Sequence, residues 1–496
     1  MAGSTLGTLF KITTWGESHG KGVGVVIDGC PAGLSLCEAD IQKFLDRRKP
    51  GQSRYATPRK EDDGVEILSG VFEGKTTGTP ISLVVFNHNQ QSRDYSEIAS
   101  YYRPGHADYT FDQKYGFRDY RGGGRSSGRE TIGRVAAGAV AVKILNELGI
   151  TFMTYTKSIG PIAVSSGHFD FSEVTKNPLY MPDAEAAENA ENYLDACMTE
   201  LNSSGGIVEC IIKGMPAGIG DPVFEKLNAN LAKAVMSIGA VKGFEIGDGF
   251  DVAKATGKNN NDAFVLGEDG RIAKATNHAG GILGGMSDGS DIILRAAIKP
   301  TPSIAATQRT VNQSGEEISV NIKGRHDPII VPRAVVVVES MAAITIVDSL
   351  FSNMSARMDA LKDFYSKKKQ KGDTSSTPAG GIEVSPFSFS YFLAHPNMLM
   401  CKQMILTVFV IALALGAETE FQRRIVKFRP AADSTLVLRT ARISLRCSHV
   451  CLKLLASVHL VRRIALEVSG GEEENNKVEE RHKNRHSSRP SGLKKA

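Results

Sequence analysis

The strongest hydrophobic pattern in the chain runs from Ser127 to Leu148 and ends at Gly149. Apolar residues recur there at helical spacing, Ala and Gly fill many positions between them, and little polar surface comes before Lys143. Ser127 stands three residues before Glu130, which is the spacing of a capping box, so we predict a long helix that begins at Ser127. A helix that is apolar on more than one side belongs inside a fold.

The rest of residues 1–371 alternates between strand-like and helix-like patterns. Runs of β-forming residues bounded by glycines predict strands, and apolar residues at helical spacing predict helices. The predicted strands are 5–15, 23–27, a hairpin within 65–86, 151–163, 206–213, 240–250 and 292–298, and the predicted helices are 36–45, 184–202, 224–236 and 339–361.

Residues 372–496 differ in kind from residues 1–371. Residues 373–390 have the Ser, Gly, Pro and Thr content of a linker, and a basic, weakly patterned extension follows. The apolar run 404–417 is shorter than the roughly 20 residues that a helix needs to span a bilayer. We therefore predict one catalytic domain over residues 1–371, a poorly ordered extension over residues 372–496, and no membrane partner.

Charge and cysteine content narrow the class of protein. The net charge of +5 comes from the tail, because residues 371–496 hold 19 Lys and Arg against 11 Asp and Glu. The tail lacks the interleaved aromatic residues of a single-strand binder, so we predict no nucleic-acid partner. The cysteines of the main body form no CxxC pair, which favours a reducing compartment without disulfides or a zinc site. With no visible secretory signal, we predict a cytoplasmic enzyme.

Three glycines, Gly122 to Gly124, precede the central helix and indicate an anion site. Glycine lets a ligand approach the backbone, and free N–H groups at a helix start attract negative charge. Arg125 and Arg129 flank this point, which favours a phosphate or carboxylate ligand. The alternative is a surface loop with solvated arginines.

Two histidines lie on glycine-containing turns. The first strand runs into Gly16-Glu-Ser-His-Gly20, which exposes Ser18 and His19 to a ligand. His106 follows the turn-forming Pro104-Gly105, and Asp108 beside it could orient the imidazole. A structural role for either histidine remains the alternative.

Basic loops recur along the chain without evident acidic partners. Arg48 and Arg54 follow the first helix, Lys299-Pro-Thr-Pro-Ser303 is either a phosphate-binding loop or a rigid surface turn, and Arg325 and Asp327 lie together after a short strand. With the histidines, this set suits a substrate that carries several negative charges, one of which leaves with protonation by an imidazole.

Six motifs, in order, resemble the chorismate synthase family through about residue 370. They are Gly16-Glu-Ser-His-Gly20, Arg103-Pro-Gly-His-Ala-Asp108, Arg121-Gly-Gly-Gly-Arg-Ser-Ser-Gly-Arg-Glu130, His278-Ala-Gly-Gly-Ile-Leu-Gly-Gly285, Lys299-Pro-Thr-Pro-Ser303 and Gly324-Arg-His-Asp-Pro328. The resemblance implies an α+β fold, a layered sandwich of two antiparallel sheets enclosing helices, assembled as a homotetramer. It implies a carbon–oxygen lyase of the shikimate pathway that converts 5-enolpyruvylshikimate 3-phosphate to chorismate by 1,4-anti elimination of phosphate. Reduced FMN is required without net redox change, and NADPH is a candidate flavin reductant.

The resemblance also implies catalytic roles. His19 matches the histidine that assists departure of phosphate, His106 the one that protonates the reduced flavin, and Asp327 the carboxylate that helps the flavin N5 accept the substrate proton. Ser18 and Ser127 would be polar relays. No metal is implied.

The resemblance to the family also implies which residues bind the substrate and the flavin. The residues that match substrate-binding positions are Arg48, Arg54 and Arg129. Those that match flavin-binding positions are Arg125, Ser126, Ser127, Gly239, Ala240, Gly284, Lys299, Pro300, Thr301, Pro302, Ser303 and Arg325.

Three departures from the family pattern leave every catalytic group in place. Gly128 stands where Ala is frequent, Ile329 where Cys is common, and Gly239 in a variable flavin contact. The alternatives are an inactive relative that binds phosphate or nucleic acid, and a plain flavin reductase. Retention of both histidines and of the carboxylate argues against an inactive relative.

Overall fold

The computed structural model describes residues 3–57, 61–87, 97–121, 123–268, 270–322 and 327–372. Two five-stranded antiparallel sheets form its layers. The first sheet has the order β1 (Thr5–Leu6), β2 (Lys11–Gly16), β3 (Gly22–Asp28), β7 (Ile81–Phe86), β4 (Val65–Ser69). The second has the order β11 (Val241–Ile246), β16 (Ile292–Ile298), β10 (Gly206–Lys213), β8 (Thr151–Ile159), β9 (Ile162–Ala163).

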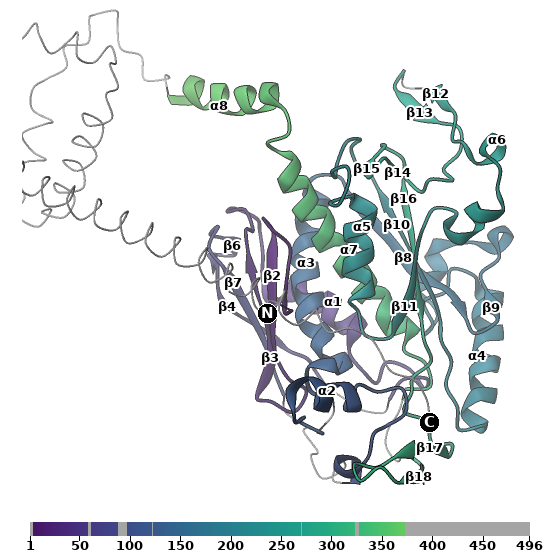
Figure 1. The fold of residues 1–496 in the computed structure, drawn as a ribbon. Coiled ribbons are helices and arrows are strands. Elements are labelled where there is room, and N and C mark those ends of the chain that lie inside the picture. Colours follow the sequence, from purple (N-terminus) through teal and green to yellow (C-terminus); the bar gives the residue numbers. More distant parts are fainter. Residues whose placement is uncertain are drawn as a thin grey trace, which may run out of the picture. The chain divides into compact units, whose positions relative to one another are not determined.

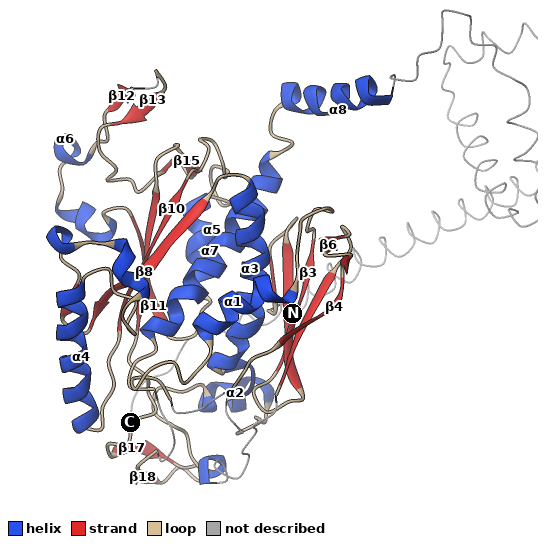
Figure 2. Ribbon diagram, turned by 180° about the vertical axis from the view of Figure 1, so that it is seen from behind, coloured by secondary structure: helices blue, strands red, loops and turns tan. Residues whose placement is uncertain are grey.

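Helices fill the space between the two sheets (Figures 1 and 2). The central ones are α1 (Glu38–Arg48), α3 (Thr131–Glu147), α5 (Leu227–Met236) and α7 (Val331–Asn353). Helix α3 packs on β3 of the first sheet, whereas α7 packs on β8 and β10 of the second, and the two helices contact each other. The predicted α+β sandwich is confirmed.

Smaller elements surround this core. The helices are α2 (Asp108–Tyr115), α4 (Ala184–Thr199), α6 (Gly257–Asn260) and α8 (Met358–Gly372). The short strand pairs are β5 (Val71–Phe72) with β6 (Lys75–Thr76), β12 (Phe264–Leu266) with β13 (Ile272–Lys274), β14 (Ile282–Leu283) with β15 (Met286–Ser287), and β17 (Gln308–Val311) with β18 (Glu317–Val320).

Helix α3 is buried on nearly every side, as its composition predicts. Between Ile132 and Leu145, every residue except Arg134 and Lys143 is buried. Gly138 lies against α7 so closely that a methyl group there would overlap Cβ and Oγ of Ser340 and lie 2.6 Å from its Cα. The small residues of α3 therefore set the spacing of the two central helices.

Helix α7 is apolar and long enough to span a bilayer by composition alone, but it is a core helix. Of its most apolar window, 72% is buried inside the fold. Near its end, the Asp348 carboxylate accepts hydrogen bonds from the backbone N–H groups of Thr8, Leu9 and Phe10 at 2.7–3.0 Å. These bonds tie α7 to the turn between β1 and β2.

Several predicted boundaries are wrong. The chain at 128–130 forms a 3-10 turn and α3 starts at Thr131, not at Ser127. Helix α7 takes in the apolar run before Glu339 and ends at Asn353, and α8 is a separate helix. The predicted strand 5–15 is two strands joined by a turn at Gly7, whose φ is +89°. The predicted division after residue 371 stays a prediction, because residues 373–496 lie outside the described part.

Candidate active site

The helix-start loop has the geometry of an N-cap. Gly123 and Gly124 adopt left-handed backbone conformations, with φ of +82° and +53°. Ser127 Oγ then accepts a hydrogen bond from the N–H of Arg129 at 3.3 Å. The predicted capping box does not form, because the N–H of Glu130 donates to the backbone carbonyl of Ser127, and the Glu130 carboxylate accepts from Thr14 Oγ1 at 3.0 Å and from Arg134 Nε at 2.7 Å.

Asn87 connects Arg129 to the turn that carries His19. Its Oδ1 accepts a hydrogen bond from Arg129 Nε, and its Nδ2 donates to the carbonyls of Glu17 at 3.1 Å and Gly20 at 2.8 Å. His19 itself is buried, and its Nδ1 lies 3.2 Å from Oγ of Ser18. The turn of Ser18 and His19 and the helix start are thus held together by one amide side chain.

The two arginines Arg48 and Arg129 share one carboxylate. Asp63 Oδ2 accepts from Arg48 Nη2 at 2.5 Å, and Asp63 Oδ1 accepts from Arg129 Nη1 at 3.0 Å. Glu61 forms a further ion pair with the same Nη1 of Arg129. The expectation that the basic loops lack acidic partners is therefore wrong for these two residues.

Both oxygens of Asp327 are held by donors. Oδ1 accepts from the backbone N–H of Thr57 at 2.7 Å, and Oδ2 accepts from Arg333 Nη1 at 2.9 Å. Arg333 also donates from Nε to the carbonyl of Arg48 at 3.0 Å. Burial lowers the pKa of Arg333, although the charge of Asp327 opposes that shift. Asp327 is therefore joined to the arginine pair through Arg333.

A second cluster forms around His106. Its Nε2 lies 2.8 Å from Oγ of Ser303, and Lys299 Nζ donates to the carbonyl of Gly105 at 2.7 Å. The backbone N–H of Lys299 donates to the carbonyl of Ala240, which follows Gly239 in the turn before β11. Burial, together with the charge of Lys242, lowers the pKa of Lys299.

The loop that contains Pro300 and Pro302 packs tightly in this cluster. A Cβ at Gly105 would lie 2.8 Å from Cβ of Pro302. Thr301 Oγ1 is buried and has no hydrogen-bond partner among the described residues. An unpartnered buried hydroxyl calls for an explanation, and a bound ligand is one.

The hypothesis that Asp108 orients His106 is wrong. The Asp108 carboxylate accepts from the backbone N–H of Arg103 at 3.0 Å and from its Nε and Nη2 at 2.8 and 2.7 Å. Burial opposes ionisation of Asp108, but the hydrogen bonds and charge of Arg103 outweigh it and hold the pKa of this carboxyl below its usual range. Asp108 thus stabilises the turn that carries His106 through its bonds to Arg103.

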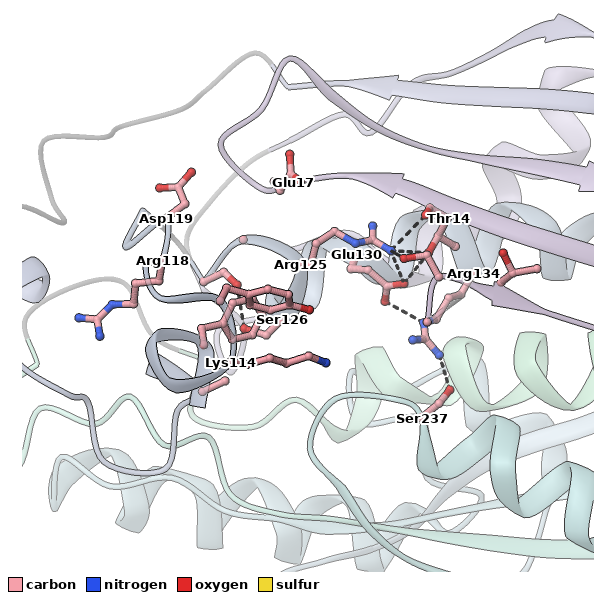
Figure 3. A pocket seen from close by; sticks show the side chains of 18 of the residues that line it. Thr14, Glu17, Lys114, Arg118, Asp119, Arg125, Ser126, Glu130, Arg134 and Ser237 are labelled. Carbon is pink, nitrogen blue, oxygen red and sulfur yellow. Dashed lines mark hydrogen bonds and ion pairs between the residues drawn. The ribbon is translucent and has the colours of Figure 1, made fainter. Parts of the chain in front are cut away.

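A cavity of about 1140 Å³ borders both histidine turns and the glycine loop. Glu17, Ala107, Arg125 and Ser126 contribute to its wall. Figure 3 shows the Arg125 side chain directed at Thr14 and Glu130. Arg125 donates to Thr14 Oγ1 at 2.7 Å and to the carbonyl of Gly16 at 3.1 Å, so it also braces the strand that leads to His19.

Three predicted residues lie apart from these clusters or outside the described chain. Arg54 has a side chain that is 62% exposed and pairs with Asp195 of α4 at 2.7 Å. Gly284 lies in the turn between β14 and β15, at the end of the second sheet opposite β17 and β18 (Figure 1). Arg325 is outside the described residues.

Sequence reasoning missed four residues that hold the site together: Glu61, Asp63, Asn87 and Arg333. The run Glu61-Asp62-Asp63 was a visible acidic signal close to the basic loop at Arg48. Within the described part of the chain, His, Cys, Asp and Glu do not gather in any group of three or more that could hold a metal ion.

Known proteins are similar to this chain over about three quarters of its length, 74% for the relatives below. The family model described as chorismate synthase matches residues 10–351. A chorismate synthase of Agathobacter rectalis is 73% identical over 367 residues, which are 74% of this chain and all of the relative, and one of Lachnospira eligens is 69% identical over the same coverage. A crystal structure of chorismate synthase superimposes with a TM-score of 0.58 at 31% identity and covers 74% of this chain and 99% of that one. The chain belongs to the chorismate synthase family.

Proposed function

We propose that the two clusters form one active site for the family's reaction, the 1,4-anti elimination of phosphate from 5-enolpyruvylshikimate 3-phosphate to give chorismate. The enzyme is a lyase of the shikimate pathway. The observation that carries the assignment of residues is the link, through Asn87, between the turn of His19 and Arg129 at the helix start. A proton donor and an anion-binding arginine are thereby fixed relative to each other.

The substrate's negative charges are bound by Arg48 and Arg129. Guanidinium groups match phosphate and carboxylate oxygens in pairs, which supports both affinity and orientation. His19 donates a proton to the oxygen of the departing phosphate, and Ser18, 3.2 Å from its Nδ1, fixes the ring. Ser127 caps the helix start beneath the phosphate, and Arg54 lies at the exposed edge of α4.

The residues around Ala240 and Lys299 to Ser303 fit a flavin phosphate and ring. The Thr301 hydroxyl, which has no hydrogen-bond partner in the described part of the chain, and the nearby cationic Lys299 support an anionic ligand in this loop. Reduced FMN, when bound, supplies transient electron donation with no net redox change. Arg125 and Ser126 of the helix-start loop and Gly239 of the turn before β11 would contact the flavin as well.

His106 and Asp327 are the proton-handling groups proposed for the flavin side. The Nε2 of His106 is oriented by Ser303, and Asp327 is fixed at both oxygens by Thr57 and Arg333. A carboxylate that is held in this way keeps one position, which proton transfer requires.

A homotetramer is proposed as the working form. Hairpin β12–β13 leaves Phe264, Leu266 and Ile272 65–78% exposed, and an isolated two-stranded hairpin is marginal in water. Assembly would also let Gly284 reach a flavin from another copy. We further propose a cytoplasmic enzyme, a catalytic domain over residues 1–371, and NADPH as a candidate flavin reductant.

The test is an anaerobic assay of the full-length protein with FMN reduced by light or dithionite. Chorismate and free phosphate are followed together after addition of 5-enolpyruvylshikimate 3-phosphate. We expect equal amounts of both products, dependent on reduced FMN. A repeat in air with NADPH then decides whether flavin reduction is built in. If neither product forms, the chain is cut after Lys371, and continued inactivity would contradict the proposal.

A further inference from the structure

The Asp63 side chain lies between the two arginines proposed to bind the substrate. Its two oxygens contact different guanidiniums, Arg48 at 2.5 Å and Arg129 at 3.0 Å. The carboxylate is fully buried, with 0% of its side chain exposed, and the Arg48 side chain is only 2% exposed. The buried Arg48 and the partly buried Arg129 therefore share Asp63, while Glu61 forms a second ion pair with Arg129 alone.

Without its two arginine partners, Asp63 would be unstable in this backbone conformation and at this burial. Its φ is +48°, in the left-handed region that non-glycine residues seldom adopt, and burial of an ionised carboxylate carries a desolvation penalty. Such a conformation persists where the surroundings fix it. Here the surroundings are the two guanidiniums, which would repel each other without an anion between them.

Arg48 depends on Asp63 more than Arg129 does. The other bond from the Arg48 guanidinium, to the carbonyl of Gly128, is long at 3.5 Å. Its Nε is buried without a hydrogen-bond partner in the described part of the chain. Asp63 therefore provides the one short contact that fixes the direction of this guanidinium among the described residues.

We infer that Asp63 is a positioning residue for the substrate-binding arginines. One of its oxygens binds Arg48 and the other binds Arg129, so the carboxylate sets the distance between the two guanidiniums. This inference rests on the proposed function of Arg48 and Arg129. It adds a role for an acidic residue at a site that binds an anion.

A positioning role for Asp63 and a purely electrostatic role predict opposite changes in substrate KM when its charge is removed. Removal of a negative charge beside an anion site should strengthen substrate binding if only the net charge matters. If Asp63 positions the arginines, its removal should weaken binding although the site becomes more positive. The direction of the change in KM therefore separates the two explanations.

The experiment measures steady-state kinetics with 5-enolpyruvylshikimate 3-phosphate and reduced FMN for wild type, Asp63→Asn and Asp62→Asn. Asn keeps the shape of the side chain and tolerates a left-handed backbone. Asp62 is exposed, so Asp62→Asn removes the same charge one residue away and serves as the matched control. We expect Asp63→Asn to raise KM roughly tenfold or more, with kcat changed by less than about threefold, and Asp62→Asn to leave both near wild type.

An unchanged or lowered KM in a folded Asp63→Asn variant would overturn the inference. If this variant does not fold, Asp63→Glu replaces it, because it keeps the charge and moves the carboxylate by one methylene. A raised KM again supports positioning, and a wild-type KM contradicts it.

If the wild-type protein shows no turnover, the proposed function is contradicted, but the role of Asp63 can still be tested. Titration of inorganic phosphate by calorimetry then tests Asp63 alone. Weaker phosphate binding by Asp63→Asn than by Asp62→Asn supports positioning of the arginines, and equal or tighter binding overturns it.

Discussion

Replacement of Gly138 by Ala tests how closely the two central helices pack. Gly138 of α3 faces Ser340 of α7, and Ser340 is fully buried. A methyl group at this position would overlap the Cβ and Oγ of Ser340 and approach its Cα to 2.6 Å. Because a Cα cannot rotate away, the helices themselves must move apart.

The magnitude is the difference of two opposing terms. Ala is a better helix former than Gly by about 1 kcal/mol in a helix interior. Overpacking of a dense core costs about 1–3 kcal/mol, with the upper end expected where backbone must shift. We therefore expect Gly138→Ala to lower the free energy of unfolding by roughly 2 kcal/mol, although propensity alone predicts a gain.

The measurement is guanidinium unfolding followed by circular dichroism, with Gly128→Ala as the matched control. Gly128 lies in the 3-10 turn before α3, and a Cβ there would meet nothing within 4 Å. The control should equal or exceed wild type by about 0.5 kcal/mol. Addition of Ser340→Gly to Gly138→Ala should restore part of the loss. Wild-type stability of Gly138→Ala would refute the close packing of α3 on α7.

The remaining predictions concern Asp348 at the end of α7, the buried ion pair of Arg103 and Asp108, and the proposed proton donor His19. Asp348→Ala should lower the free energy of unfolding by about 2–3 kcal/mol, measured by guanidinium unfolding, because it leaves the buried N–H of Phe10 unpaired. The pKa of Asp108 is depressed by Arg103, so its contribution to stability is present above the unfolded pKa of about 3.9 and is lost as pH falls through the folded value. The unfolding midpoints of wild type and Asp108→Asn should therefore differ at pH 7 and converge below about pH 4. His19→Ala should slow phosphate release roughly 10²-fold in single-turnover assays while flavin binding, measured by fluorescence titration, is retained; an unchanged rate would remove His19 from the proton path.

Hydrophobic patterning predicted the core of this fold well because its signals are local. The apolar, small-residue composition of α3 indicates burial on several sides, and Gly138 shows the physical reason for those small residues. Boundaries failed where the pattern is ambiguous. A largely apolar run such as 329–338, interrupted by Arg333, fits a buried strand or a buried helix, and packing of α7 on both α3 and the second sheet decides for helix.

For the candidate site, the sequence suggests residues but not the contacts between them. Local motifs point to His19, Arg129 and Asp327 as candidates, whereas the residues that contact them come from distant parts of the chain, as Asn87 does for Arg129. Asp108 shows the opposite error. It lies two residues after His106 in the sequence, but in the structure its carboxylate binds Arg103.

Arg48, one of the two proposed substrate-binding arginines, is linked to Asp327 through a contact at the end of a helix. It is the last residue of α1, where carbonyl groups lack partners within the helix. Its carbonyl accepts from Arg333, which holds Asp327, while its guanidinium contacts Asp63, which holds Arg129. Arg48 therefore relates the position of the proposed substrate-binding guanidiniums to that of the Asp327 carboxylate. A shift of the end of α1 would move both together, so their separation is preserved only while Asp63 and Arg333 both keep their contacts with Arg48.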